Sequence, residues 1–323
     1  MMWNLPLFPD QASDQAAKVD GVTFFLLAIT VAFTVLIAGQ VIFFGIKYRM
    51  GSKADRSGKK SASHRLEAFW IGGTFILCVI MYGVSTHVFF QLYDPPPDAS
   101  EVYVVGKQWM WYLQHPEGKR ETNELHVPIG KPIKLLMTSQ DTIHSFYIPA
   151  FRIKQDVLPG RYTSLWFRPT KVGKYHLFCA EYCGANHSRM GGYVTVMELA
   201  DYEVWLSSKA DGSGGNKSMA SAGAELFQQH HCAGCHGENG QGGRGPSLIG
   251  LLGKDVPIAI KGGGVTTVKA DEKYIRDSIL EPQSQVVAGY DAIMPSYKDQ
   301  ISEPDLLQII AYIKGLGTKE AGQ

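Results

Sequence analysis

The chain has 323 residues, of which 45% are hydrophobic and 19% charged, and its formal net charge is +1. A chain of this length accommodates two or three domains, and a charge so near zero gives no sign of a nucleic-acid partner. Five cysteines fall as the single Cys78 and two close pairs, which does not resemble a disulfide framework.

Two uncharged apolar segments near the N-terminus, 22–46 and 68–92, are each long enough to cross a bilayer as a helix. As buried helices of a soluble core they would need a large surrounding domain, which the short N-terminal region cannot supply. We therefore expect residues 1–93 to form an N-terminal segment and two transmembrane helices. Cys78, inside the second segment, is most simply a small apolar filler.

The loop between these segments, from Lys47 to Arg65, carries seven lysines and arginines against one acid, Asp55. The positive-inside rule places such a loop in the cytoplasm. Both termini and the region after Asp94 should then face the periplasmic side of a bacterial inner membrane. The first residues lack the basic start and small-residue cleavage site of a simple signal peptide, so we expect the first span to remain as an anchor.

Residues 94–206 contain short segments rich in β-branched and aromatic residues, such as EVYVVGKQWMWYLQ, KPIKLLMTS and GKYHLFCA, separated by Gly, Pro or Asn. This pattern predicts an all-β sandwich or barrel. Residues 207–218, rich in Gly and Ser, have the composition of a flexible linker, which would permit a mobile contact between the regions on either side.

Residues 219–323 change to short helical patterns, the last of which begins at Ser302 and ends at glycine. A small helical domain with so many glycines has too little apolar content for an ordinary core, so another group should fill it. Its first helix runs into Cys232-Ala-Gly-Cys235-His236, the attachment pattern of c-type haem. The two thiols bind the haem covalently, and His236 becomes the proximal iron ligand.

A redox Cys-x-x-Cys motif or half of a zinc site would also explain this pair, but the sequence has no second such motif and no thioredoxin-like pattern around it. The sixth iron ligand of an electron carrier should be a thioether, which Met294 in AIMPSY supplies. With GPSL and the final helix, residues 219–318 resemble a class I cytochrome c. The segment KDVPIAIKGGGVTTVKA has no counterpart in that resemblance.

The first cysteine pair lies in CAEYCGANHSRM, which also contains His187 and Met190. Structural zinc sites seldom use methionine, so the thioether favours copper. A mononuclear blue-copper centre uses one cysteine and would leave the other unexplained. Two thiolates that bridge two copper ions require a second histidine, and His144 in TIHSFYIP is available upstream.

With these residues the chain resembles subunit II of the haem-copper cytochrome c oxidases over residues 20–318, with a fused cytochrome c. The resemblance implies a binuclear copper centre, CuA. Its ligands would be the imidazoles of His144 and His187, the bridging thiolates of Cys179 and Cys183, the Met190 thioether and the Glu181 backbone carbonyl.

The resemblance also implies three further roles. The Glu181 side chain would reach a magnesium ion at the boundary with the catalytic subunit. Trp109 in GKQWMWY would be the residue through which electrons enter the copper centre, and Glu67 in RLEAFW would lie at the mouth of a proton channel.

We therefore expect a multidomain membrane protein with a transmembrane hairpin, an all-β cupredoxin-like domain at 94–206 and an all-α cytochrome c domain at 219–323. It would be the electron-transfer subunit of a cytochrome c oxidase. Cytochrome c or a quinol-oxidising complex would reduce the haem, which would reduce CuA. Electrons would then pass to the oxygen-reducing subunit I, beside which further oxidase subunits assemble.

Two other functions remain open from the residues. The first is an anchored donor subunit of a nitric or nitrous oxide reductase, although Glu181 and the helical hairpin argue against the latter. The second is a copper-delivery factor, which would bind one copper reversibly and need no haem. Such a factor would place a helix after Cys183, where this sequence is broken by glycines.

Overall fold

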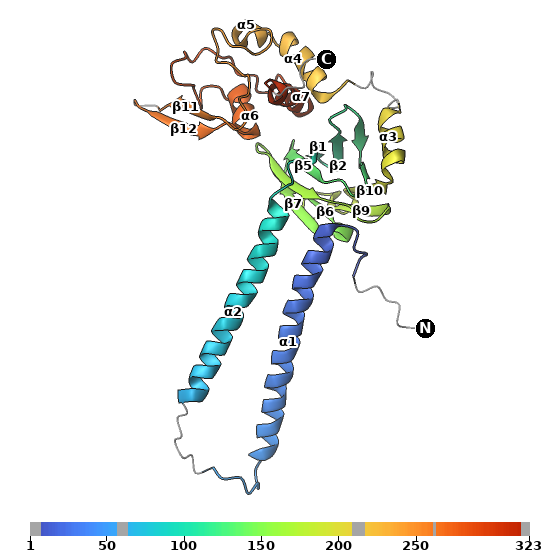
Figure 1. Cartoon of the computed structure of the whole chain (residues 1–323), viewed down its shortest axis with the longest axis vertical. Coiled ribbons are helices and arrows are strands. Elements are labelled where there is room, and N and C mark those ends of the chain that lie inside the picture. Colours follow the sequence, from blue (N-terminus) through green and yellow to red (C-terminus); the bar gives the residue numbers. More distant parts are fainter. Residues whose placement is uncertain (1–7, 57–63, 209–216, 261–262, 318–323) are drawn as a thin grey trace.

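The computed structural model describes residues 8–56, 64–208, 217–260 and 263–317. Most of the predicted linker 207–218 and part of the basic loop lie outside these residues. Three parts follow one another along the chain: a hairpin of two long helices, a β-sandwich and a small, mainly helical domain (Figure 1). This architecture confirms the predicted fold class.

The two long helices are α1 (Asp14–Lys47) and α2 (His64–Tyr93), both long and apolar enough to cross a membrane. Helix α1 begins before the predicted span because Ser13 caps it, its hydroxyl oxygen accepting a hydrogen bond from the Ala16 amide. Its first turns are buried against the β-sandwich, so the helix continues beyond the apolar segment.

Each sheet of the sandwich has five strands among the described residues. One sheet has the order β3 (Arg120–Thr122), β2 (Met110–Gln114), β1 (Ser100–Lys107), β5 (Ile133–Ser139), β8 (Thr163–Phe167). The other has the order β4 (Glu124–Pro128), β10 (Gly191–Met197), β9 (Gly173–Cys179), β6 (His144–Ile148), β7 (Ile153–Val157). Strands β1 and β5 are parallel, as are β4 and β10.

The core of the sandwich lies between the sheets and contains Trp111, Phe146 and Phe167, which are fully buried. The segment EVYVVGKQWMWYLQ, predicted as one strand, is two antiparallel strands that turn between Lys107 and Met110. Shorter helices flank the strands: η1 (Pro149–Phe151), η2 (His187–Arg189) and α3 (Leu199–Ser207).

The third part, called the cytochrome domain below, contains α4 (Met219–Gln229), α5 (Ala233–His236), β11 (Asp255–Ala259), β12 (Val265–Lys269), α6 (Glu272–Leu280) and α7 (Glu303–Gly315). The segment that matched no part of the cytochrome resemblance forms the antiparallel hairpin β11–β12. Helices α4 and α7 cross closely, since a Cβ on Gly223 would lie 1.9 Å from the Gln308 carbonyl oxygen.

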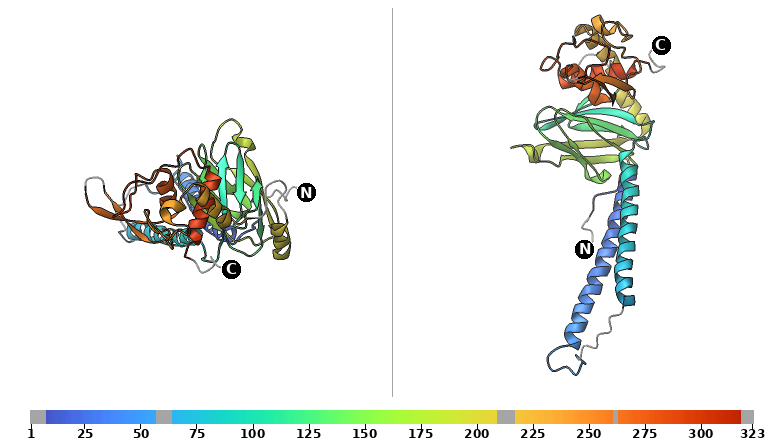
Figure 2. Two further views of the ribbon diagram at one scale, coloured as in Figure 1. Left: turned by 90° about the horizontal axis from the view of Figure 1, so that it is seen from above. Right: turned by 90° about the vertical axis from the view of Figure 1, so that its left-hand side faces the viewer.

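The cytochrome domain rests on the outer face of the sheet that contains β1 and β5. Figures 1 and 2 show it at the opposite end of the sandwich from the two long helices. Its helix α5 lies on the side that faces away from the sandwich, whereas α7 lies close to β1 and β5.

Candidate metal and haem sites

The predicted copper ligands come from two neighbouring strands and one loop. His144 is the first residue of β6, and Cys179 is the last residue of β9, which pairs with β6. The chain then turns through Cys183, where Gly184 has a φ of +112°, and returns through η2 to β10. Because glycine adopts this backbone conformation without strain, the chain can reverse direction here and bring His187 and Met190 close to Cys183.

All six predicted copper donors lie in one cluster. The Sγ atoms of Cys179 and Cys183 are 3.8 Å apart. Around Cys179 Sγ, His144 Nδ1 lies at 3.9 Å and the Glu181 carbonyl oxygen at 3.2 Å. Around Cys183 Sγ, His187 Nδ1 lies at 3.5 Å and Met190 Sδ at 3.7 Å. Each sulfur therefore has one imidazole and one weaker donor beside it.

The chemistry of this donor set fits soft metal ions held between two thiolates. Both cysteines are buried, as are His144 and Met190. Burial raises the pKa of Cys179, but its hydrogen bonds with His144 and with nearby backbone groups outweigh this effect and lower the pKa to about 6. Burial and the charge of Cys179 raise the pKa of Cys183 to about 12. The lowered pKa of Cys179 favours its thiolate, and a cation bound between the two sulfurs would favour ionisation of Cys183 as well.

Two residues that the sequence did not single out position His144. Its Nε2 donates to Asp141 at 2.8 Å, so that Nδ1 faces the thiols. Gly106 of β1 lies against the other side of the ring, where an added Cβ would be 2.9 Å from His144 Cδ2 and 3.1 Å from Trp111. Asp141 is three residues from His144 in the sequence, but nothing there indicates the contact with Gly106.

The three residues with less specific predicted roles lie in different places. Trp109 borders the copper cluster, and its Nε1 donates to the Cys183 carbonyl at 3.2 Å. Glu67 is in the first turn of α2, mostly exposed, at the end far from the sandwich. The Glu181 carboxylate belongs to no group of three His, Cys, Asp or Glu ligands within the described part of the chain.

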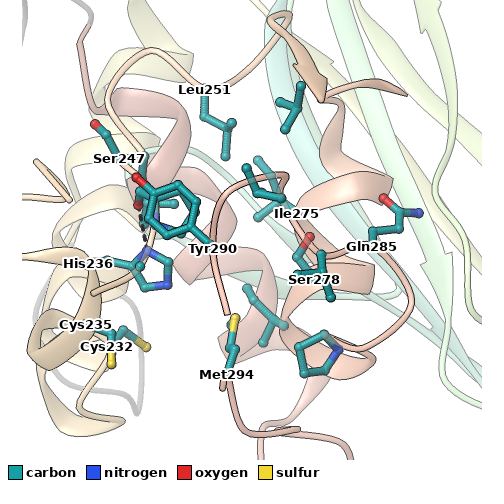
Figure 3. A pocket seen from close by; sticks show the side chains of 18 of the residues that line it. Cys232, Cys235, His236, Ser247, Leu251, Ile275, Ser278, Gln285, Tyr290 and Met294 are labelled. Carbon is teal, nitrogen blue, oxygen red and sulfur yellow. Dashed lines mark hydrogen bonds between the residues drawn. The ribbon is translucent and has the colours of Figure 1, made fainter. Parts of the chain in front are cut away.

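The haem-attachment residues line a cavity of about 300 Å³ in the cytochrome domain. Cys232 and Cys235 lie on one side of it with His236, and Met294 extends from the loop opposite (Figure 3). His236 Nδ1 donates to the Pro246 carbonyl at 2.9 Å, which leaves Nε2 for the cavity. The four predicted haem residues therefore share one cavity.

The walls of this cavity fit a large, flat, apolar group. Ile275 and Ile279 of α6 and Ile309 and Ile313 of α7 line it, and hydrophobic surface predominates in it. Gly245 packs on the imidazole of His236, with space for no Cβ, which would lie 2.8 Å from Cε1. This apolar cavity agrees with the expectation that a group other than side chains fills the core of the domain.

The chain combines a helical hairpin that can cross a membrane with a β-sandwich that contains a buried cluster of thiols and imidazoles. Its third part has the residues that attach a haem. These features together define a class of membrane-bound electron-transfer protein. The comparisons with known proteins agree with this class. Residues 119–197 match the family described as cytochrome c oxidase subunit II, periplasmic domain, and residues 220–317 match the cytochrome c family.

The relatives extend over most of the chain. The alternative cytochrome c oxidase subunit 2 of Bradyrhizobium diazoefficiens is 30% identical over 58% of this chain and 78% of its own length. The cytochrome c oxidase subunit 2 of Alkalihalophilus pseudofirmus is 29% identical over 91% of this chain and 86% of its own. The chain therefore belongs to the cytochrome c oxidase subunit 2 family.

A crystal structure of the periplasmic domain of cytochrome oxidase subunit II from Bradyrhizobium japonicum is also similar, with 30% identity and a TM-score of 0.34. It covers 35% of this chain and 94% of the solved chain. Family membership makes the chain a membrane-anchored subunit of a cytochrome c oxidase with a periplasmic domain, an electron-transfer role and a copper site, and the match to the cytochrome c family adds a c-type haem. Its partners are subunit I and other oxidase subunits.

Proposed function

We propose that the chain accepts electrons at a covalent haem, passes them to a binuclear copper centre and delivers them to the oxygen-reducing subunit. The observation that carries this proposal is the convergence of the six copper donors, with one histidine beside each thiol. Held by these residues, a pair of copper ions would supply a one-electron carrier.

The copper-site residues exclude water and keep the donors in place. Asp141 accepts from His144 Nε2, from the amide nitrogens of Gln108 and Thr142 and from the Ser139 hydroxyl, so four donors fix its carboxylate. It holds the His144 ring in the tautomer whose Nδ1 lone pair points to Cys179. Both sulfurs are buried, which keeps the thiolates from solvent and from oxidation.

In the haem site, Cys232 and Cys235 would hold the porphyrin covalently, and His236 and Met294 would bind its iron. The Pro246 carbonyl orients His236, as Asp141 orients His144. Because the chain itself would supply both iron ligands, the group would serve electron transfer and would offer no site for oxygen.

The proposed orientation places both termini and the cytochrome domain in the periplasm, together with the β-sandwich at residues 94–206, called the copper domain below. The basic loop lies in the cytoplasm. Hydrogen bonds from residues before α1 to the β-sandwich support this orientation, since Ala12 donates its amide to the Ala150 carbonyl at 3.0 Å. The roles of Trp109 in electron uptake, of Glu67 at a proton channel and of Glu181 at magnesium stay predictions, as does the identity of the electron donor.

The test is the stoichiometry of copper and haem in the full chain, purified in detergent after expression with haem-attachment machinery. We expect two coppers per covalent haem and an electron paramagnetic resonance spectrum of one electron shared by two coppers. Cys183→Ser should abolish the shared-electron signal and retain the haem. The double variant Cys232→Ser/Cys235→Ser should lose the covalent haem and retain the shared-electron signal. A single copper with a localised signal, readily lost to a chelator, would favour a copper-delivery factor.

A further inference from the structure

The cytochrome domain contacts the copper domain through one face of α7 and the first residue of α4. Residues 307, 311 and 314 lie along that face, spaced as one side of a helix. The apolar contact joins Met219, Leu307 and Ala311 of the cytochrome domain to Tyr103, Val105 and Leu136 of the sheet.

A cluster of four charges lies at the edge of this contact. Lys314 Nζ is 2.6 Å from Glu101 of β1 and 2.9 Å from Glu272 of α6. Lys134 of β5 pairs with the other oxygen of Glu101 at 2.8 Å. The side chains are 17 to 25% exposed, so water screens them weakly, and two cations balance two anions. Such a cluster favours one relative position of the two domains.

Backbone contacts restrict the position further. The amide of Met219 donates to the Pro116 carbonyl at 2.9 Å. In the copper domain, Gly118 packs so closely on the chain that enters α4 that an added Cβ would be 1.9 Å from the Lys217 carbonyl oxygen. Polar, ionic and apolar contacts therefore all belong to one docked arrangement.

This arrangement puts little protein between the two sites. On α7, the face opposite the contact carries Ile309 and Ile313, which line the haem cavity. On β1, the residue after Val105 is Gly106, which lies against the imidazole of His144. One helix, about 10 Å across with its side chains, and one strand thus separate the cavity from the copper cluster.

Among the described residues, the opposite side of the cytochrome domain does not contact the sandwich. Helix α5, which contains Cys235 and His236, lies on the side away from the sheet (Figure 1), and the cysteine side of the cavity is farthest from the sandwich strands (Figure 3). An external donor can therefore approach α5 while α7 remains docked.

We propose that the cytochrome domain passes electrons to copper from this docked position, through α7 and β1 to the His144 side of the cluster, and that Glu101 and Lys314 hold it there. This inference rests on the proposed function. In each step one electron leaves the haem iron, which is oxidised, and the copper pair is reduced by one electron. No bond is made or broken and no proton moves. Trp109, beside Cys183, lies off this route.

The test measures haem-to-copper transfer in the full chain loaded with haem and copper, after a light flash generates a one-electron reductant that reduces the haem. Glu101→Lys places a cation beside Lys314, and we expect roughly a tenfold slower transfer because the docked fraction falls. Glu101→Gln should have a smaller effect. The matched control is Glu124→Lys, which reverses one partner of an exposed ion pair in the same domain and should leave the rate unchanged.

A second measurement reports docking without any redox reaction. Amide hydrogen exchange should become faster in α7 and around Met219 in Glu101→Lys, and remain unchanged in β9 and β10. Unchanged exchange would show that Glu101 does not hold the domain. Faster exchange in Glu101→Lys with an unchanged rate of haem-to-copper transfer would overturn the route. The route would also be overturned if transfer were slower in Trp109→Phe but normal in Glu101→Lys. If the unmodified chain shows no haem-to-copper transfer, the proposed function itself fails.

Discussion

Gly106 leaves space for the imidazole of His144, one of the predicted copper ligands, because it has no side chain. It lies on β1, and its Cα faces the imidazole of His144 and the ring of Trp111. Because β1 is paired on both sides, to β2 and to β5, its backbone cannot move away from the ring. Any side chain at this position must displace His144 or Trp111.

We therefore expect Gly106→Ala to impair the copper site. Overpacking of this kind costs about 1 to 3 kcal/mol, and the strain falls on the His144 ring. The full chain should bind less copper and show an altered paramagnetic spectrum, with the haem content unchanged. Gly315→Ala in α7 is the control, since an added Cβ meets nothing within 4 Å there. Normal copper content and spectrum in Gly106→Ala would contradict this account of His144.

The sequence predicted the donors of this site but not their supports. Cys179, Cys183, His187 and Met190 lie within twelve residues, and their chemistry alone indicates copper. Gly106 is far from them in the sequence, and a glycine in a strand has many explanations. Its role becomes visible only when the two sheets pack and bring β1 against β6.

Among the elements, α3 depends most clearly on a polar cluster. Glu121 accepts from His115 Nε2 at 2.8 Å and from the His126 amide at 3.0 Å, and its side chain is only 6% exposed. The His126 ring stacks on Trp205 of α3 with centroids 4.5 Å apart, and Tyr202 of α3 bonds to His115. Glu121 thus orients both histidines that hold α3 on the sandwich.

This cluster predicts a pH dependence of stability. Burial raises the pKa of Glu121, but hydrogen bonds from His115 and His126 outweigh it, so the folded-state pKa lies below the ordinary value of 4.5. A lowered carboxyl pKa contributes stability above pH 4.5 that is lost as the pH falls through the folded-state pKa. Glu121→Gln should lower the free energy of unfolding by about 1 to 3 kcal/mol at pH 7. The difference should shrink below pH 4.5.

The measurement is denaturant unfolding of the copper-free chain, followed by tryptophan fluorescence, at several pH values between 7 and 3. Glu124→Gln is the matched control. It removes a carboxylate from an exposed pair with Lys174, so a change below about 0.5 kcal/mol is expected at every pH. A difference for Glu121→Gln that stays constant as the pH falls would show that the charge of Glu121 is not the source.

Element prediction was most reliable where local signals agree. Helix α7 begins at Ser302, whose hydroxyl accepts from the Asp305 amide, and its apolar pattern is helical throughout. By contrast, α3 and the hairpin β11–β12 were not predicted. Helix α3 has nine residues and no side-chain cap, so its stability comes from the contacts of Trp205 and Tyr202 with distant histidines.

At the scale of the whole molecule, the N-terminal segment fastens the membrane helices to the copper domain. Its three aspartates each pair with a cation of the sandwich: Asp10 with Lys171 at 2.7 Å, Asp14 with Arg168 at 3.4 Å and Asp20 with Arg152 at 2.8 Å. The hydroxyl of Ser13 also donates to the Phe151 carbonyl at 2.9 Å. Phe151 ends η1, which directly follows β6, the strand that begins with His144.

The sequence could not indicate this attachment, because the partners are more than a hundred residues apart and exposed aspartates are common. Charge counting predicts a cytoplasmic position for the basic loop between the two long helices. It could not predict that the acidic segment binds the copper domain and so couples the start of α1 to the copper site. That coupling depends on the folded arrangement of both regions.

Asp20→Asn tests how much this attachment contributes. Asp20 accepts two parallel hydrogen bonds from Arg152, both at 2.8 Å, and both side chains are about nine-tenths buried. Removing the charge leaves the Arg152 guanidinium buried without its counter-ion, which should cost about 3 kcal/mol. Amides 8–16 should exchange faster, and the copper domain should unfold at a lower temperature. Asp10→Asn disrupts an exposed ion pair, so its amide exchange and its unfolding temperature should stay near those of the unmodified chain. Equal, small effects of the two variants would mean that the hydrogen bonds of the Ala12 amide and the Ser13 hydroxyl, and not the buried ion pair, hold the first helix to the copper domain.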